Sequence, residues 1–174
     1  RQRQMCIRDR NALATAGIED AEIVVAGPYN ISGTAALVGA IKSYENMTGE
    51  TVSQENVDTA TNELVVTGKL AESVGDSDKA EQLVGAVKEQ VVEGSDNGKK
   101  LTEEEIGNVV DQAAQEMDVQ LSDEDRQEIV DLMDKIKGLD IDVDSLKEQA
   151  KDLYDKIDDL GLKLDWNCLL YTSD

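Results

Sequence analysis

The residue types of this 174-residue chain exclude several common kinds of catalytic site. It contains no histidine, and its two cysteines, Cys6 and Cys168, lie near its two ends. Histidine-based triads and histidine metal sites are therefore excluded, and no serine stands in the Ser-x-x-Lys spacing of serine–lysine enzymes. The sequence predicts no catalytic residue, no metal ligand and no cofactor.

A glycine-rich loop within residues 21–44 (AEIVVAGPYNISGTAALVGAIKSY) is the one segment that suggests a ligand site. It connects an apolar run to a helix, and the free N–H groups at a helix N-terminus favour anions. The loop lacks both the GxGxxG spacing and the GK[ST] ending of nucleotide-phosphate loops. Helix capping by Ser32 or Thr34 and close helix packing explain the same residues without a ligand. The candidate ligand-binding residues are Pro28, Tyr29, Ser32, Gly33 and Thr34.

Two acidic segments have part of the spacing of an EF-hand calcium loop. Asp140, Asp142 and Asp144 alternate as its first ligands do, but Ser145 and Lys151 stand where glycine and a bidentate glutamate are needed. A second alignment over residues 93–104 begins with glutamate instead of aspartate and places a lysine at a hydrophobic position. Helix capping accounts for most of these acids, and an acidic calcium-responsive module remains an alternative.

Both ends of the chain resemble translated sequencing-adapter sequence. Residues 1–10 (RQRQMCIRDR) can be written in codons that match a transposon mosaic-end adapter, and residues 168–173 (CLLYTS) match its reverse complement. We therefore expect residues 1–10 and about 168–174 to be foreign, and we leave them out of the fold prediction. Both cysteines lie in these segments, so we expect no native disulfide.

The net charge of −21 limits the kinds of partner. Binding to nucleic acid or to an anionic membrane depends on lysine and arginine, so neither is an expected partner. No run approaches the roughly 20 apolar residues of a membrane-spanning helix. Acidic residues are spread over the whole chain, which is typical of solvent-facing helix surfaces.

The elements predicted up to residue 49 form a strand-loop-helix unit. Residues 23–26 are an apolar run typical of a strand buried on both faces, whose sheet partners we expect upstream of this chain. A helix follows at about residues 34–47 and is closed by Gly49. Its small residues 35, 36, 39 and 40 predict close packing against a sheet.

About five amphipathic helices are predicted after residue 50. Their apolar stripes cover residues 57–74, 80–91, 106–117, 129–136 and 146–160. Asp78, Thr102, Ser122 and Ser145 are each followed three residues later by an acid, as in a capping box. The predicted class is α+β and mainly α: the unit at 11–49, as the remnant of a truncated α/β core, followed by a helical bundle or hairpin array.

The segments TAGI (15–18), SGTAAL (32–37) and the Tyr44-Glu45 pair resemble an uncharacterised bacterial family, domain of unknown function 1002. ELVVTG (63–68) agrees in character. The resemblance implies an extracytoplasmic, often secreted bacterial protein with a further N-terminal region and no established activity, and it assigns no catalytic residue.

These observations favour a non-enzymatic structural or binding role, with a protein or cell-envelope component as partner. The alternative is an enzyme whose active site combines the loop at 28–34 with the missing N-terminal region. The expected organisation is an adapter-like segment at 1–10, the strand-loop-helix unit at 11–49, a helical region at 50–166 with a hinge at 94–100, and an adapter-like segment at 167–174. A fragment of this kind is typical of a metagenomic read.

Overall fold

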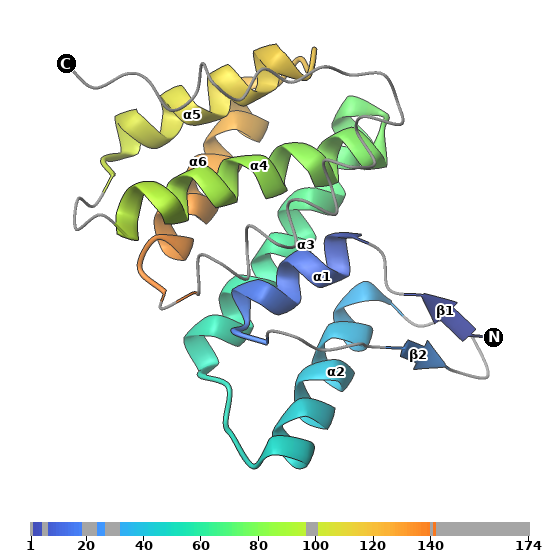
Figure 1. Cartoon of the computed structure of the whole chain (residues 1–174). Helices are drawn as coiled ribbons and strands as arrows, with labels where there is room; N and C mark the ends of the chain where they lie inside the picture. Colours follow the sequence, from blue (N-terminus) through green and yellow to red (C-terminus); the bar gives the residue numbers. More distant parts are fainter. Residues whose placement is uncertain are drawn as a thin grey trace.

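Six helices make up most of the described chain (Figure 1). The computed structural model describes residues 2–4, 7–18, 24–26, 32–96, 101–139 and 141. The elements in chain order are β1 (Gln2–Gln4), α1 (Ile7–Thr15), β2 (Val24–Ala26), α2 (Gly33–Thr48), α3 (Gln54–Val74), α4 (Ser77–Asp96), α5 (Glu103–Glu116) and α6 (Asp123–Ile136).

The helix starts follow the capping residues in the sequence. Ser32 caps α2, and the predicted capping boxes are present at Thr102 with Glu105 and at Ser122 with Asp125. Each box satisfies two N–H groups that the helix itself leaves without partners. The start of α4 differs from the prediction: Asp76, not Asp78, caps it, because its Oδ1 accepts from the N–H groups of Asp78 at 3.0 Å and Lys79 at 3.1 Å.

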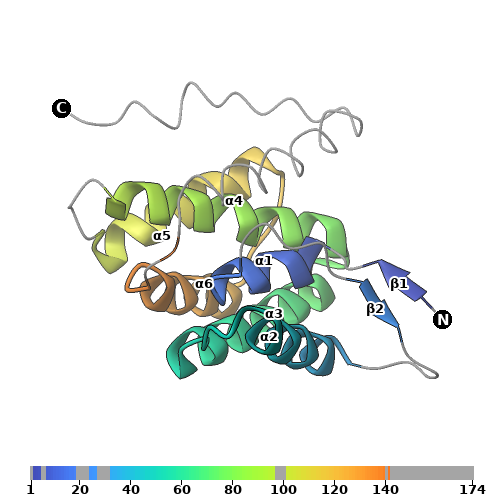
Figure 2. The ribbon, with the colours of Figure 1, turned by 60° about the horizontal axis from the view of Figure 1, so that its bottom comes forward.

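The prediction of an α+β class is wrong, because the fold is helical. The predicted buried strand contributes only the three residues of β2, which pair antiparallel with β1 in a two-stranded sheet. A pair of such short strands is marginal on its own and cannot act as the core of a domain. Helix α2, expected to pack on a sheet, packs on α1 and α3 (Figure 2). The strand-loop-helix unit is therefore not a building block of this fold.

Helix α3 contributes to two apolar clusters. The first, at its N-terminal half, joins α1 and α2 and contains Ala12, Leu13, Ala16, Ile18, Leu37, Ala40, Ile41, Ala60 and Leu64. The second, larger cluster joins the C-terminal half of α3 to α4, α5 and α6, and includes Leu70, Leu83, Val87, Ile106, Val110, Ile129, Leu132 and Met133. Figure 1 shows α4, α5 and α6 on one side of the molecule and α2 on the other, with α3 running between them.

Several predictions concern residues outside those described. The fifth amphipathic helix, at 146–160, and the C-terminal adapter-like segment are among them. Of the predicted hinge at 94–100, residues 94–96 belong to α4 and the other four lie outside the described residues. The boundaries of the predicted helical region and of the adapter-like segments therefore remain predictions. Within the part of the chain that the structure describes, every helix is too short or too polar to span a lipid bilayer.

Candidate functional site

The predicted ligand loop is only partly described by the structure. Pro28 and Tyr29 lie outside the described residues, whereas Ser32, Gly33 and Thr34 form the N-terminal end of α2. Ser32 has an extended backbone, and its Oγ accepts from the N–H of Ala35 at 3.2 Å. This capping bond is the structural alternative that the sequence predicted for this hydroxyl. A ligand at the loop remains a prediction.

A buried polar network joins α1, α3 and α4. The Lys88 ammonium on α4 donates to Glu63 Oε1 on α3 at 2.9 Å, and on α1 to Thr15 Oγ1 at 3.2 Å and to the carbonyl oxygen of Asn11 at 2.6 Å. The Thr15 hydroxyl in turn donates to Glu63 Oε2. We call these four groups the Lys88–Glu63–Thr15 network.

The network is closed to solvent, and all of its polar side-chain atoms have partners. Lys88 is 1% exposed, and Glu63 and Thr15 are 0% exposed. The ammonium has three donors and three acceptors, and both carboxylate oxygens of Glu63 accept a hydrogen bond. Burying two charges is unfavourable unless they are paired and hydrogen-bonded in this way. The arrangement therefore joins three helices and leaves no open position for a substrate or an ion.

Sequence reasoning missed this network, although the helical periodicity contains a signal for it. Glu63 lies on the buried stripe of α3, directly before Leu64, and Lys88 lies on the buried stripe of α4, one turn after Val84 and three residues before Val91. Single charges near an apolar stripe usually reach solvent, so neither stood out. One acid and one base, each on the buried stripe of a neighbouring helix, are the pattern that could have indicated a pair.

The Tyr44-Glu45 pair fixes the connection between α2 and α3. The Tyr44 hydroxyl donates to a carboxylate oxygen of Glu50 at 2.7 Å, and Glu45 Oε1 accepts from the N–H of Val52 at 3.1 Å. The hydrogen bond from the Lys42 ammonium, together with that from Val52, holds the pKa of Glu45 below its usual value. These two residues therefore hold the loop against the end of α2.

Polar contacts on the surface attach α6 to α3 and α5. Arg126 forms a two-bond pair with Asp111, from Nε at 2.6 Å and from Nη2 at 2.8 Å, and this hydrogen bonding lowers the pKa of Asp111. Burial raises the pKa of Asp125, but hydrogen bonds from the side chains of Ser122 and Ser73 and the Ser122 N–H outweigh it, so the net shift is downward. Both carboxylates thus stay charged to a lower pH than a free aspartate does.

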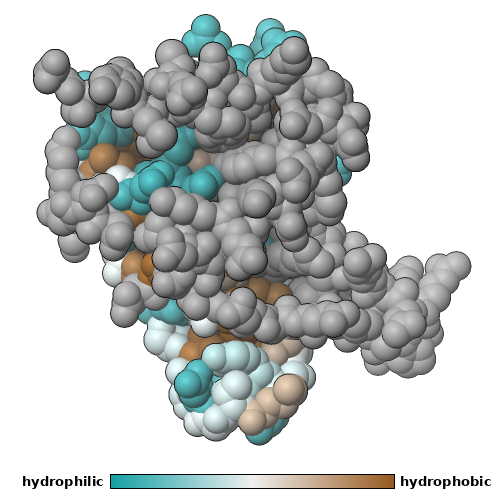
Figure 3. Space-filling model, viewed as in Figure 1, coloured by the Kyte–Doolittle hydropathy of each residue, from teal (hydrophilic) through white to brown (hydrophobic). Residues whose placement is uncertain are grey.

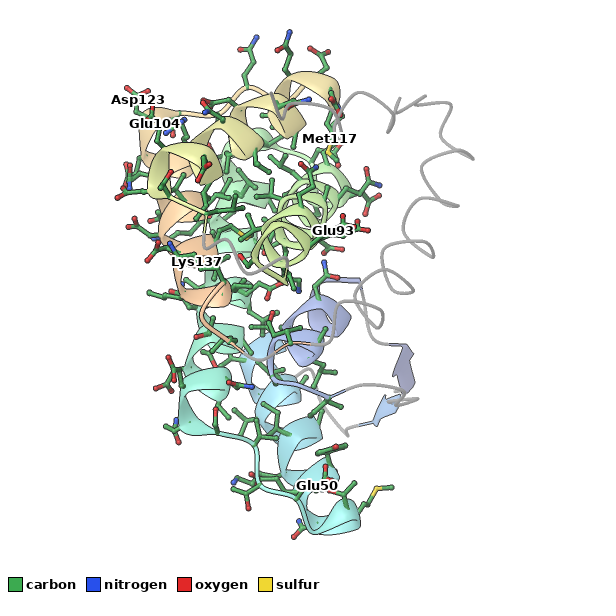
Figure 4. All side chains as sticks on the ribbon, turned by 60° about the vertical axis from the view of Figure 1, so that its left-hand side comes forward. Glu50, Glu93, Glu104, Met117, Asp123 and Lys137 are labelled. Atoms are coloured by element: carbon green, nitrogen blue, oxygen red, sulfur yellow. The ribbon has the colours of Figure 1, made fainter. Side chains whose placement is uncertain are left out.

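No metal site is formed by the residues whose positions are described. Within that part of the chain, no three acidic or cysteine side chains lie close enough to hold an ion. Asp140, Asp142 and Asp144 of the first calcium alignment are not described, and neither are Asn97 and Gly98 of the second. Glu104, the last residue of the second alignment, is exposed at the end of the molecule opposite Glu50 (Figure 4).

Comparison with known proteins places the chain in a family. Residues 8–153 match the family described as "Protein of unknown function (DUF1002)". The chain belongs to this DUF1002 family. It is also 37% identical over 147 residues to "Uncharacterized protein YpuA" of Bacillus subtilis (strain 168), a match that covers 84% of this chain and 49% of that protein. The chain therefore spans about half the length of this curated relative. No solved structure matches it.

The match confirms the resemblance inferred from the sequence. Thr15 of the Lys88–Glu63–Thr15 network begins TAGI, a segment on which that resemblance rested. Its partner Glu63 begins ELVVTG, which agreed with the family in character only. Gly17 of the same TAGI segment follows α1 with a positive φ of 78°, a backbone conformation that favours glycine. In the described residues, TAGI, SGTAAL and the Tyr44-Glu45 pair thus lie at helix ends and position helices.

Proposed function

We propose that this chain is the helical part of a non-enzymatic bacterial protein with a structural or binding role outside the cytoplasm. Its partner would be a protein or a component of the cell envelope. The observation that carries the proposal is the closed Lys88–Glu63–Thr15 network. Its charged groups are buried and fully paired, so they connect helices and are not available to a substrate.

The hydrogen bonding of Ser32, at the predicted loop, supports the same role. Ser32, which could serve an enzyme as a nucleophile, accepts a capping hydrogen bond at the start of α2. A catalytic serine also needs a base within hydrogen-bond reach. The chain has no histidine, so such a base would have to come from another residue type or from the rest of the protein.

A serine-reactive probe distinguishes this role from the enzyme alternative. The full-length protein is incubated with a fluorophosphonate, and the labelled residue is located by mass spectrometry. We expect no label at Ser32 or Thr34. Stoichiometric labelling of Ser32 that disappears in Ser32→Asp would overturn the proposal. Because aspartate caps helices as well as serine does, this variant removes the hydroxyl without removing the cap. Ser53→Asp, at the corresponding cap of α3, is the matched control.

The location and the partner are tested in cells of the source bacterium or a close relative. The full-length protein, tagged at its C-terminus, is expressed, and intact cells are treated with a protease that cannot cross the membrane. We expect the tag to be cleaved and the protein to sediment with purified cell envelopes. A protected tag would contradict the extracytoplasmic location, and a protein that stays in the supernatant would contradict an envelope partner.

A further inference from the structure

The Lys88–Glu63–Thr15 network lies at the boundary between the two apolar clusters. Thr15 is preceded on α1 by Ala14, which belongs to the larger cluster, and followed by Ala16, which belongs to the smaller one. On α3, Glu63 stands beside Leu64 of the smaller cluster and three residues before Val66 of the larger one. The network therefore lies where the part of the molecule formed by α1 and α2 joins the rest.

Helix α1 depends on this network more than the other helices do. As described, it runs from Ile7 to Thr15, and the buried side chains on its second half are two alanines, Leu13 and Thr15 itself. A helix of this length is not stable alone, and Leu13 is the one large apolar side chain that its second half buries. By contrast, α4 and α6 bury leucine, valine, isoleucine and methionine side chains in the larger cluster.

Separation of α1 also restores water to the buried charges. Lys88 and Glu63 lose hydration when the network is closed, and this loss is recovered when α1 moves away from them. Separating α5 from α6 would expose apolar side chains such as Val110 and Ile129, with no charge to rehydrate. Opening at α1 is therefore the less costly of the two movements.

We propose that the network is a latch for α1. When its hydrogen bonds break, α1 leaves α3 and α4 while α4, α5 and α6 remain packed. The two apolar clusters thus form two units of different stability that share α3, and the hydroxyl of Thr15 couples them. This conformational device is independent of the role proposed above, since it would operate in a binding protein or in an enzyme.

Hydrogen exchange of the full chain, followed by mass spectrometry on peptides, tests the latch. In the unaltered protein we expect the α1 amides to exchange faster than those of α4 and α6, although each of the three helices has buried side chains among its described residues. Thr15→Val removes the hydroxyl with little change in shape and leaves Glu63 Oε2 without its donor. It should speed exchange in α1 by about tenfold or more, the effect of one unsatisfied buried group, while exchange in α5 and α6 stays the same.

Two further variants make the result specific. Thr67→Val is the matched control, because Thr67 is buried on α3 one turn from Glu63 but its hydroxyl donates within its own helix, to the Glu63 carbonyl oxygen at 2.8 Å. It should leave α1 exchange unchanged, and Thr15→Ser should restore the slow exchange. The latch is refuted if α1, α4 and α6 speed up together in Thr15→Val, or if Thr67→Val accelerates α1 equally.

Discussion

Gly39 stands inside α2 with open space where a side chain would be. No heavy atom lies within 4 Å of the position that its Cβ would occupy, so the close packing predicted for this side of the helix is absent at Gly39. Ala36 and Ala40, which are buried, face the other helices instead. The small residues of α2 thus lie on two different sides of the helix, one packed against other helices and one exposed. Their spacing in the sequence alone did not distinguish the two sides.

Gly39→Ala is expected to stabilise the protein. Alanine inside a helix is more favourable than glycine by about 0.5–1 kcal/mol, which corresponds to a rise in Tm of roughly 1–4 °C for a chain of this size. Gly49→Ala is the matched control, because Gly49 ends the same helix with a φ of 77° and alanine there is strained. Its Tm should fall. A fall in Tm for Gly39→Ala would show that another part of the protein contacts this surface.

The Asp111–Arg126 pair gives a small, pH-dependent contribution to stability. Because the hydrogen bonds from Arg126 lower the pKa of Asp111, the pair stabilises the fold fully above the ordinary aspartate pKa, and the effect is lost as the pH falls through the lowered value. The Arg126 side chain is 36% exposed and the Asp111 side chain 54%, so solvent screening limits the contribution to about 1 kcal/mol or less.

Asp111→Asn measures this contribution. In urea unfolding we expect the variant to be less stable at pH 7 and equal to the unaltered protein once the pH is below the lowered pKa of Asp111. High salt at pH 7 should also reduce the difference, because the pair is exposed. A difference that is the same at neutral and strongly acidic pH would mean that the lost stability comes from packing and not from charge.

Removing one charge should cost more stability at the buried Lys88–Glu63 pair than at the Asp111–Arg126 pair on the surface. Lys88→Met leaves the Glu63 carboxylate buried without its cation, and breaking such a pair costs about 3–5 kcal/mol. Replacing both partners, as in Lys88→Met with Glu63→Leu, should recover most of this loss, because two apolar side chains of similar size need no partner. Thr15 can then donate within its own helix, to the carbonyl oxygen of Asn11.

Chemical unfolding of the two variants checks this expectation. We expect the single variant to unfold at much lower urea concentration, and the double variant to unfold near the unaltered protein. If the double variant is as unstable as the single one, the charges themselves would be required for folding, and the network would be more than a way to satisfy buried groups.

Helix positions were largely predictable from the sequence, whereas contacts between helices were not. Local features, such as the Thr102–Glu105 capping box and the glycine at position 75, depend on neighbouring residues and identify helix ends directly. The apolar run that contains Val24 and Val25 has β propensity, but propensity does not show whether a sheet exists for it to join. Among the residues that the structure describes, only Gln2–Gln4 pairs with it.

At the scale of the whole molecule, the division of α3 between two clusters could not be read from its stripe. The apolar positions continue without interruption from Val57 to Val74, and only three-dimensional contacts show that the first half packs on α1 and α2.

The exposed hydrophobic residues Val38, Met47 and Val65 belong to two helices, and Met47 is 86% exposed. Figure 3 shows a surface of mixed hydropathy at the lower end of the molecule, so exposed apolar residues alone do not identify a binding surface there.

The charge of the molecule opposes its compact state. With a net charge of −21, like charges repel one another across the surface, as the outward-pointing carboxylates of Figure 4 illustrate. Salt has two opposite effects, because it screens this repulsion and also weakens exposed pairs such as Lys69–Glu128. The repulsion should dominate, since the chain has 38 acidic and only 17 basic residues.

We therefore expect Tm to rise when NaCl increases from about 0.01 M to about 0.1 M, which shortens the screening length from about 30 Å to about 10 Å. Thermal unfolding of the full chain, monitored by circular dichroism, measures the shift.

Millimolar Mg²⁺ and Ca²⁺ should then act alike, as screening ions. A larger rise with Ca²⁺ than with Mg²⁺ would instead support the calcium-responsive alternative, because Ca²⁺ accepts the flexible, many-ligand oxygen geometry that Mg²⁺ does not. Asp142→Asn and Asp144→Asn should abolish that excess if the first calcium alignment is correct, and Asp111→Asn, on α5, is the control for the loss of one charge.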